Sequence, residues 1–161
     1  MDIGIKEVAL VTLGFFLSFF PQWFDRRRKI RAHWLALRAE ASLCTEKALG
    51  YIDAGIIAPL YRLPTVAFEK AFPVLLVEGE LSEQESLSIN RFFAHVQDIN
   101  RGLDNATFMA HADKLDVLTR EFNRNLSKAA ELTSNLESEK SLSGSALKVM
   151  NTKLRRGWWR R

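Results

Sequence analysis

An uncharged apolar run occupies most of the first 24 residues of the chain. From Val8 to Phe24 the sequence reads VALVTLGFFLSFFPQWF and carries no ionisable side chain. A membrane-spanning helix needs roughly 20 apolar residues, with about 17 at the short end of the range. Trp23 suits the membrane interface, and Pro21 lies near the end of the run, where a lost backbone hydrogen bond is tolerable. The pattern predicts a transmembrane anchor at residues 1–24, with a helix buried in a soluble core as the alternative.

The charges on either side of this run predict its orientation. Lys6 precedes it, whereas a basic cluster follows it at once, made of Arg26, Arg27, Arg28, Lys29 and Arg31. Basic residues within about 15–20 positions of a membrane helix favour the cytoplasmic side. The leader is nearly neutral and bulky residues close the run, which is unlike a cleavable signal peptide. We therefore expect a single-pass protein of the bacterial inner membrane, with its N-terminus outside and its remaining residues in the cytoplasm.

A helix is predicted directly after the anchor, from about Arg26 to Ala54. Apolar residues recur there at alternating steps of four and three, the spacing of one helix face: Ile30, Trp34, Leu37, Ala41, Cys44, Ala48 and Tyr51. Gly55 and Pro59 are expected to end this helix. The following segment, Ala58 to Pro64, is read as a rigid connector, in which Tyr61 and Arg62 are either displayed to a partner or packed over the loop.

Three further helical segments are predicted beyond the connector. The first runs from about Thr65 to Val77 and is expected to be kinked or interrupted at Pro73. A second begins at the capping box formed by Ser82 and Glu85. Its inward face carries Ile89, Phe92, Phe93, Val96, Ile99 and Leu103. Gly102, Asp104 and Asn105 indicate a turn or a loosening at its end, after which an apolar stripe from Phe108 to Leu136 predicts one long amphipathic helix, packed antiparallel against the helix at 26–54.

The expected fold class is therefore all-α: one N-terminal transmembrane helix followed by a small helical bundle with long amphipathic helices. The bundle is assigned to residues 25–141 as a cytoplasmic helical domain. Long apolar seams also form coiled coils between chains, but aromatic residues such as Phe92 and Phe122 favour a bundle, because coiled-coil seams prefer aliphatic side chains. The length of 161 residues suits one such domain with an appendage.

Charge is distributed in three blocks. Residues 25–38 hold six basic and one acidic residue, residues 39–136 nine and fourteen, and residues 137–161 seven and two. The last block begins in the serine-rich loop at residues 138–145 and continues as a basic, Trp-rich tail at residues 142–161. Tryptophan and arginine together favour an anionic membrane surface. The expected lipid-contact residues are Trp23, Arg26, Arg27, Arg28, Lys29, Arg155, Arg156, Trp158, Trp159, Arg160 and Arg161. A tail bound to nucleic acid is disfavoured because the centre of the chain is acidic, and a solvated tail is the other alternative.

Candidate chemistry is sparse. The single cysteine, Cys44, excludes an internal disulfide and is read as a small buried residue, with a nucleophilic thiol as the lesser alternative. His33, His95 and His111 are scattered, and no metal site, cofactor-binding motif, phosphate loop or nucleophile elbow is visible. No catalytic residue and no small-molecule ligand are predicted.

These features favour a membrane-anchored helical interaction or scaffold module that binds a protein partner or a second copy of itself. One alternative is an enzyme acting on a membrane-proximal substrate, with Cys44, Tyr61 or a histidine in its site. Another is a prophage-type envelope protein whose helical part lies in the periplasm.

Overall fold

The computed structural model describes residues 4–54, 62–78, 81–112, 115–134, 138 and 140–155, without the side chains of residues 5–7, 9, 15–19 and 115. Over these residues the protein is all-helical, and the predicted helical bundle is confirmed. Its helices are α1 (Ile5–Ala54), α2 (Val66–Glu78), α3 (Glu83–His111), α4 (Leu115–Thr133) and α5 (Leu142–Arg155).

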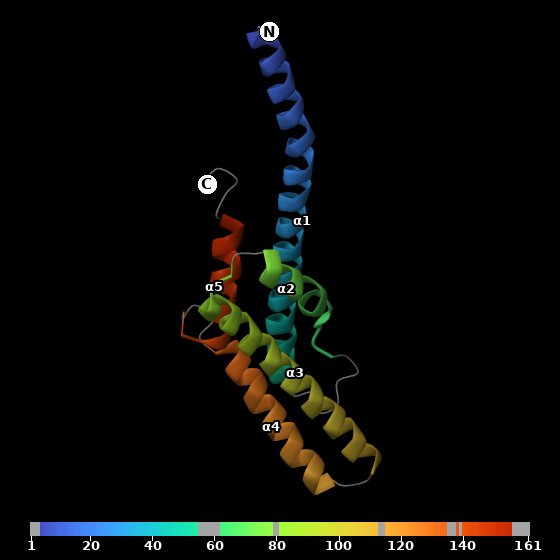
Figure 1. Ribbon diagram of the computed structural model, residues 1–161. Helices are drawn as coiled ribbons and strands as arrows, with labels where there is room; N and C mark the ends of the chain where they lie inside the picture. Colours follow the sequence, from blue (N-terminus) through green and yellow to red (C-terminus); the bar gives the residue numbers. More distant parts are fainter. Residues whose placement is uncertain are drawn as a thin grey trace.

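α1 is the longest described helix, and the other helices pack around its C-terminal part. Figure 1 shows its N-terminal part extending far beyond them. We call residues Ile5–Phe24 of α1 the arm. The arm and the helix predicted at 26–54 are one continuous helix of 50 residues that contains Pro21. A proline in a helix lacks one hydrogen-bond donor and crowds one preceding carbonyl, and here the helix continues past it to end at Ala54, as predicted.

The other helices surround the C-terminal part of α1 (Figure 1). α3 and α4 form an antiparallel hairpin, and α4 packs against α1 and runs in the opposite direction, as predicted. α2 packs on α1, while α5 packs on α1 and α3. The predicted seam of α1 is buried from Trp34 to Tyr51, and it meets Phe92, Phe93 and Val96 of α3 in one core. Phe68 stacks on Phe93 with ring centroids 4.3 Å apart, which adds α2 to that core.

The start of α3 is confirmed in atomic detail. The Ser82 side chain accepts a hydrogen bond from the amide of Glu85, and the Glu85 carboxylate accepts one from the amide of Ser82, at 3.3 and 2.8 Å. This exchange satisfies two backbone donors that the first turn of a helix would otherwise leave unpaired.

The predicted loosening at Gly102 is wrong, because α3 continues unbroken to His111. Gly102 is buried, and a Cβ atom built on it would lie 2.7 Å from Cγ of Asn125 on α4. The missing side chain therefore admits α4 at close range. The glycine marks a contact between two helices, not a bend.

The single long helix predicted from Phe108 to Leu136 is also wrong. α3 ends at His111 and α4 begins at Leu115, so the stripe belongs to two helices. The stripe residues of α4 face the core at Ala129 and Leu132, whereas Ala112, the stripe residue at the end of α3, is exposed and follows the same spacing without lying on the core face. Phe108, counted as the first residue of the stripe, has 67% of its surface exposed.

Two further expectations differ from the structure. α2 is not interrupted at Pro73, because its buried face of Ala71, Phe72 and Leu75 packs into the core on both sides of the proline. The expected loop at 138–145 becomes helical at Leu142, where α5 begins. Ser143, Gly144, Ala146 and Met150 of α5 are buried, so residues 142–155 pack with the bundle.

Candidate functional site

The described side chains of the arm are uncharged and open to the surroundings. Its large exposed apolar residues are Val8, Leu10, Val11, Leu13, Phe20 and Trp23. A side chain added at Gly14 would meet no atom within 4 Å. The hydroxyl of Thr12 donates to the carbonyl of Val8 at 2.7 Å, so its polar group is satisfied within the helix. Val8, Leu10, Val11 and Leu13 each have more than half of their surface exposed.

Aromatic and basic residues meet where the arm ends. The rings of Phe20, Trp23 and Phe24 lie 5.0 to 6.2 Å apart between centroids. The guanidinium carbon of Arg27 lies 4.0 Å from the centre of the Trp23 ring, which is a cation–π contact. The apolar part of α1 thus changes to a basic part within about one helical turn.

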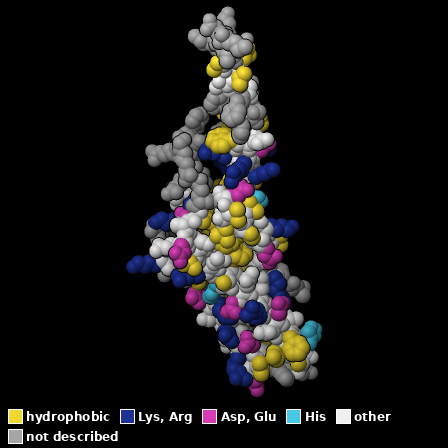
Figure 2. All heavy atoms as spheres, viewed as in Figure 1, with side chains coloured by type: hydrophobic (Ala, Val, Ile, Leu, Met, Phe, Trp, Pro, Cys, Tyr) yellow, Lys and Arg dark blue, Asp and Glu magenta, His cyan; other side chains and the backbone are white. Residues whose placement is uncertain are grey.

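The basic cluster predicted after the anchor lies at this junction. Arg26, Arg28 and Lys29 are exposed, and Arg27 is half-buried. Figure 2 shows Lys and Arg side chains gathering where the arm joins the bundle. Arg26 is also tied to the end of α2, since its Nε lies 2.8 Å from Oε2 of Glu78. The structure therefore brings Trp23 and the residues at 26–29 together on one short stretch of α1.

The predicted tail is described only at its beginning. Arg155 is exposed in the last turn of α5, and the C-terminal end of that helix points toward the same end of the bundle as the arm (Figure 1). The remaining predicted tail residues lie outside the described part of the chain: Arg156, Trp158, Trp159, Arg160 and Arg161. Within the part that is described, no helix is both long and apolar enough to qualify as a membrane span.

A buried carboxylate that the sequence reasoning missed fixes α2 to α1. Glu40 is 8% exposed, and its two oxygens accept hydrogen bonds from the amides of Ala67 and Phe68 at 2.8 and 2.7 Å. These amides belong to the first turn of α2, where backbone donors lack partners within the helix and the helix dipole favours negative charge. The signal was available, because Glu40 directly precedes Ala41 in the buried seam.

The connector before α2 is held by polar contacts with α3. The side-chain amide of Asn100 accepts from the amide of Leu63 and donates to its carbonyl, both at 2.8 Å. Arg62 lies 2.6 Å from Asp104 and also donates to Thr107. Arg62 therefore packs along α3 instead of being displayed, while Tyr61 lies outside the described residues.

Cys44 is buried in the core, as predicted. Its thiol donates a hydrogen bond to the carbonyl of Pro64 at 3.2 Å. Burial and the nearby Glu40 carboxylate raise the pKa of Cys44 to about 12. Because the thiolate is the nucleophilic form, this environment is opposed to a catalytic role and favours a structural one.

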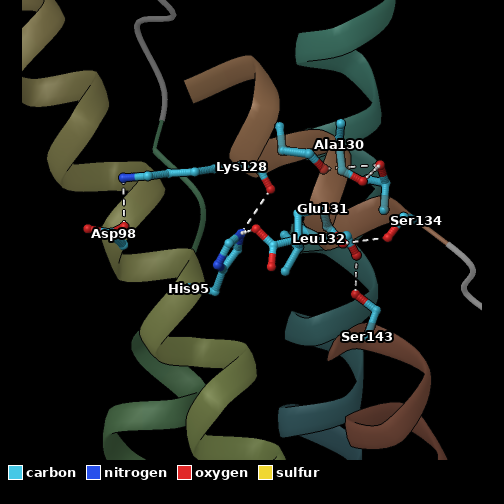
Figure 3. A network of polar contacts seen from close by, with 10 residues as sticks. His95, Asp98, Lys128, Ala130, Glu131, Leu132, Ser134 and Ser143 are labelled. Atoms are coloured by element: carbon cyan, nitrogen blue, oxygen red, sulfur yellow. Dashed lines mark hydrogen bonds and ion pairs between the residues drawn. The ribbon is translucent and has the colours of Figure 1, made fainter. Parts of the chain in front are cut away.

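His95 takes part in a polar network between α3 and α4, drawn in Figure 3. Its Nε2 lies 2.9 Å from the carbonyl of Lys128 and 4.0 Å from Glu131. Lys128 reaches Asp98 at 2.6 Å, and its hydrogen bond lowers the pKa of that carboxyl group. Nearby, the hydroxyl of Ser143 donates to the carbonyl of Leu132, which joins α5 to α4. Each of these groups has a partner in a neighbouring helix, so the network acts as a connection between helices.

A second ion pair joins α5 to α3. Lys153 is almost wholly buried, and its Nζ lies 2.9 Å from Oε2 of Glu85. Burial by itself raises the pKa of Glu85, but hydrogen bonds from Lys153 and Ser82 outweigh it, so the pKa lies below its ordinary value. The capping box of α3 and the packing of α5 therefore share one carboxylate.

Among the described residues, no three histidine, cysteine or acidic side chains lie close enough together to hold a metal ion. His33 is half-buried on α1, and His111 is exposed in the last turn of α3. Comparison with protein-family models, with curated proteins and with solved structures finds no match to this chain. The junction between the arm and the bundle is thus the feature with the clearest functional character.

Proposed function

We propose that this protein is a membrane-anchored helical interaction module, with the arm as its single membrane helix and the bundle on the cytoplasmic face. The observation that carries the proposal is the junction itself: a helix with exposed apolar side chains changes, at Trp23 and Arg27, into a helix with exposed basic side chains. In water the exposed apolar side chains of the arm, such as Val11 at 74% and Leu10 at 68%, would contact solvent, whereas lipid would solvate them.

The dimensions of α1 support this assignment. The uncharged run has 17 residues, from Val8 to Phe24, and includes the five apolar or small residues 15–19 whose side chains are outside the described set. At about 1.5 Å per residue it spans about 25 Å, slightly less than the roughly 30 Å of a hydrocarbon core, a mismatch that bilayers accommodate. An unbroken helix also pairs its backbone groups internally, as the lipid interior requires.

The orientation is proposed from charge. The basic cluster at residues 26–29 lies on the bundle side of the arm, and Arg155 ends a helix that points to the same side. Basic residues near an anionic leaflet contribute about 1 kcal/mol each. We therefore propose that the bundle lies in the cytoplasm and that the basic tail contacts the inner membrane surface.

An interaction role for the bundle is supported by its outer surface. The half of α1 that lies in the bundle carries large apolar side chains on its exposed side, at Leu35, Leu43, Leu49 and Ile52. Such residues provide contact area for a protein partner or for a second copy of the chain. Cross-linking in native membranes followed by pull-down identifies that partner.

The anchor is tested by a matched pair of substitutions on α1. Leu13→Arg places a charge in the arm, where it costs about 2.5–3.5 kcal/mol at the centre of a membrane helix, and Leu35→Arg places the same charge on an exposed apolar position of the bundle. We expect Leu13→Arg to shift the protein into the alkaline-carbonate supernatant while Leu35→Arg stays in the membrane pellet. Equal extraction of the two variants would refute the anchor.

Topology and tail contact have their own tests. A C-terminal reporter that is active only in the cytoplasm is expected to be active, and an active periplasmic reporter would instead support the envelope-protein alternative. For the tail, replacing Arg155, Arg156, Arg160 and Arg161 by Ser is expected to weaken binding of the arm-deleted chain to anionic vesicles. Unchanged binding would exclude tail contact.

A further inference from the structure

α2 is apolar on two sides, but only one of them is covered. Its inner side packs Ala71, Phe72 and Leu75 into the core. On its outer side, at the C-terminal end, Leu76 is 46% exposed and the adjacent Val77 is 87% exposed. Single exposed apolar residues are ordinary on protein surfaces, so what the adjacent pair Leu76 and Val77 contacts must be argued from its place in the fold.

The place of this pair in the fold indicates what that something is. Glu78, which follows Val77, is held by Arg26 through the 2.8 Å ion pair. Arg26 is three residues beyond Trp23, or about 4.5 Å along the helix axis. In Figure 1 the C-terminal end of α2 also lies nearer the arm than its N-terminal end does. Leu76 and Val77 thus lie at the level of the junction.

The charge around the pair fits an anionic lipid surface. The carboxylate of Glu78 is paired with Arg26, and Lys29, which follows Arg26 by three residues on the same side of α1, is exposed. Figure 2 shows apolar side chains gathering over the part of this face where α2 lies, directly below the Lys and Arg side chains at the base of the arm. Apolar residues flanked by basic ones are the composition of helices that rest in the headgroup region.

We propose that the C-terminal end of α2, through Leu76 and Val77, is a second lipid-contact site that dips into the headgroup region beside the arm. This inference rests on the proposed function, because it requires the arm to be in the membrane. It adds a point of attachment away from the α1 axis. With two such points, the bundle is held at one tilt and one rotation relative to the membrane instead of turning about a single helix.

The test uses the full chain in vesicles of phosphatidylcholine and phosphatidylglycerol. Three single variants, Val77→Cys, Leu10→Cys and Phe108→Cys, are each labelled with a polarity-sensitive NBD dye. All three positions are largely exposed, so the substitutions leave the core intact. Cys44 stays in place, because it is buried with a pKa of about 12 and its thiol is hydrogen-bonded. Unsubstituted protein measures any labelling at Cys44, and circular dichroism checks the helical content of each variant.

The expected result is that the dye at Val77 is quenched by spin-labelled lipid, as is the dye at Leu10 in the arm. The dye at Phe108, at the far end of α3, is expected to respond to aqueous iodide, with a quenching slope several-fold larger than that at Val77. If Leu10 is quenched by lipid and Val77 by iodide, the α2 site is refuted while the anchor stands. If Leu10 itself is quenched by iodide, the proposed function fails. A Val77 dye shielded from both quenchers would show that protein covers it, which also overturns the proposal.

Discussion

Replacing Glu40 by glutamine tests whether one buried carboxylate holds α2 in place. A glutamine keeps one carbonyl oxygen for one of the two amides, Ala67 or Phe68, and turns its NH₂ group toward the other. A hydrogen bond to a charged group contributes about 1.5–3 kcal/mol, and a buried donor left unpaired costs about 1–3 kcal/mol. Losing the negative charge at the helix N-terminus adds a further 0.3–1 kcal/mol or so. Since these contributions overlap, we expect the free energy of unfolding to fall by about 2–4 kcal/mol.

The assay is urea unfolding of the full chain in a mild detergent, followed by circular dichroism. With a slope of about 2 kcal/mol per molar urea, the loss lowers the midpoint by about 1–2 M. Hydrogen exchange adds a local measurement, because the amides of α2 should exchange faster in Glu40→Gln than in the parent chain. Glu46→Gln is the matched control, since Glu46 is an exposed residue on the same helix. For Glu46→Gln, the free energy of unfolding should change by no more than about 0.5 kcal/mol. If the two variants shift equally, Glu40 does not anchor α2.

Three other perturbations test separate parts of the bundle. Gly102→Ala should lower the free energy of unfolding by about 1–3 kcal/mol, because the added methyl group is overpacked against Asn125. In the double variant, Asn125→Ala should recover most of that loss. A double-mutant cycle of urea midpoints measures the recovery. In the native chain at neutral pH, Cys44 should not react with a thiol reagent. Labelling should occur only through the unfolded state, at the rate of global unfolding, and rapid labelling of the native chain would disprove its burial. Because the pKa of Glu85 is lower in the folded state than its ordinary value of 4.5, its contribution is full above that pH and is lost as the pH falls below it. The urea midpoint should therefore drop on acidification, less steeply in Glu85→Gln, and equal slopes would contradict the assignment.

Local patterns in the sequence predicted several elements well. The capping box at Ser82 and Glu85 depends on residues three apart, and the end of α1 at Ala54 follows a seam with a regular spacing. Both signals are contained in a few neighbouring residues, so no knowledge of the tertiary fold is needed. The all-helical class follows from the same periodicities.

Contacts between helices could not be predicted from such local patterns. Gly102 reads as a loosening when only its own helix is considered, but its role depends on Asn125, 23 positions away, which is buried in the structure with no hydrogen-bond partner among the described atoms. Asn125 itself lies three residues after Phe122 and four before Ala129, which is the spacing of a buried face. A polar residue at an apolar position was the available signal. Glu40 gave a similar signal, because it directly precedes Ala41 of the buried seam of α1.

The turn between α3 and α4 shows a different limit of sequence reasoning. Helical periodicity reports which side of a segment faces the core, but it carries no information about chain direction. Phe108 and Ala112 are exposed in the structure, yet they continue the spacing of Leu118 and Phe122, so the pattern resembles that of one long helix. His111 and Ala112, where α3 ends, carry no glycine or proline and are both compatible with a helix interior, so they gave no signal of the reversal.

The surface proposed to face the membrane shows both kinds of signal, the local one and the one that depends on tertiary contacts. The arm and the basic cluster at 26–29 are contiguous in the sequence and were found there, whereas Val77 is more than 50 positions from Trp23 and reads as one more apolar residue of a short helix. Apolar residues on two sides of α2 cannot be divided into inner and outer sets without its packing partners. Once Glu40 fixes the start of α2 and Arg26 meets its end, the outer residues are placed beside the junction. The same contacts that stabilise α2 therefore determine which of its apolar side chains stay exposed and are available for the proposed lipid contact.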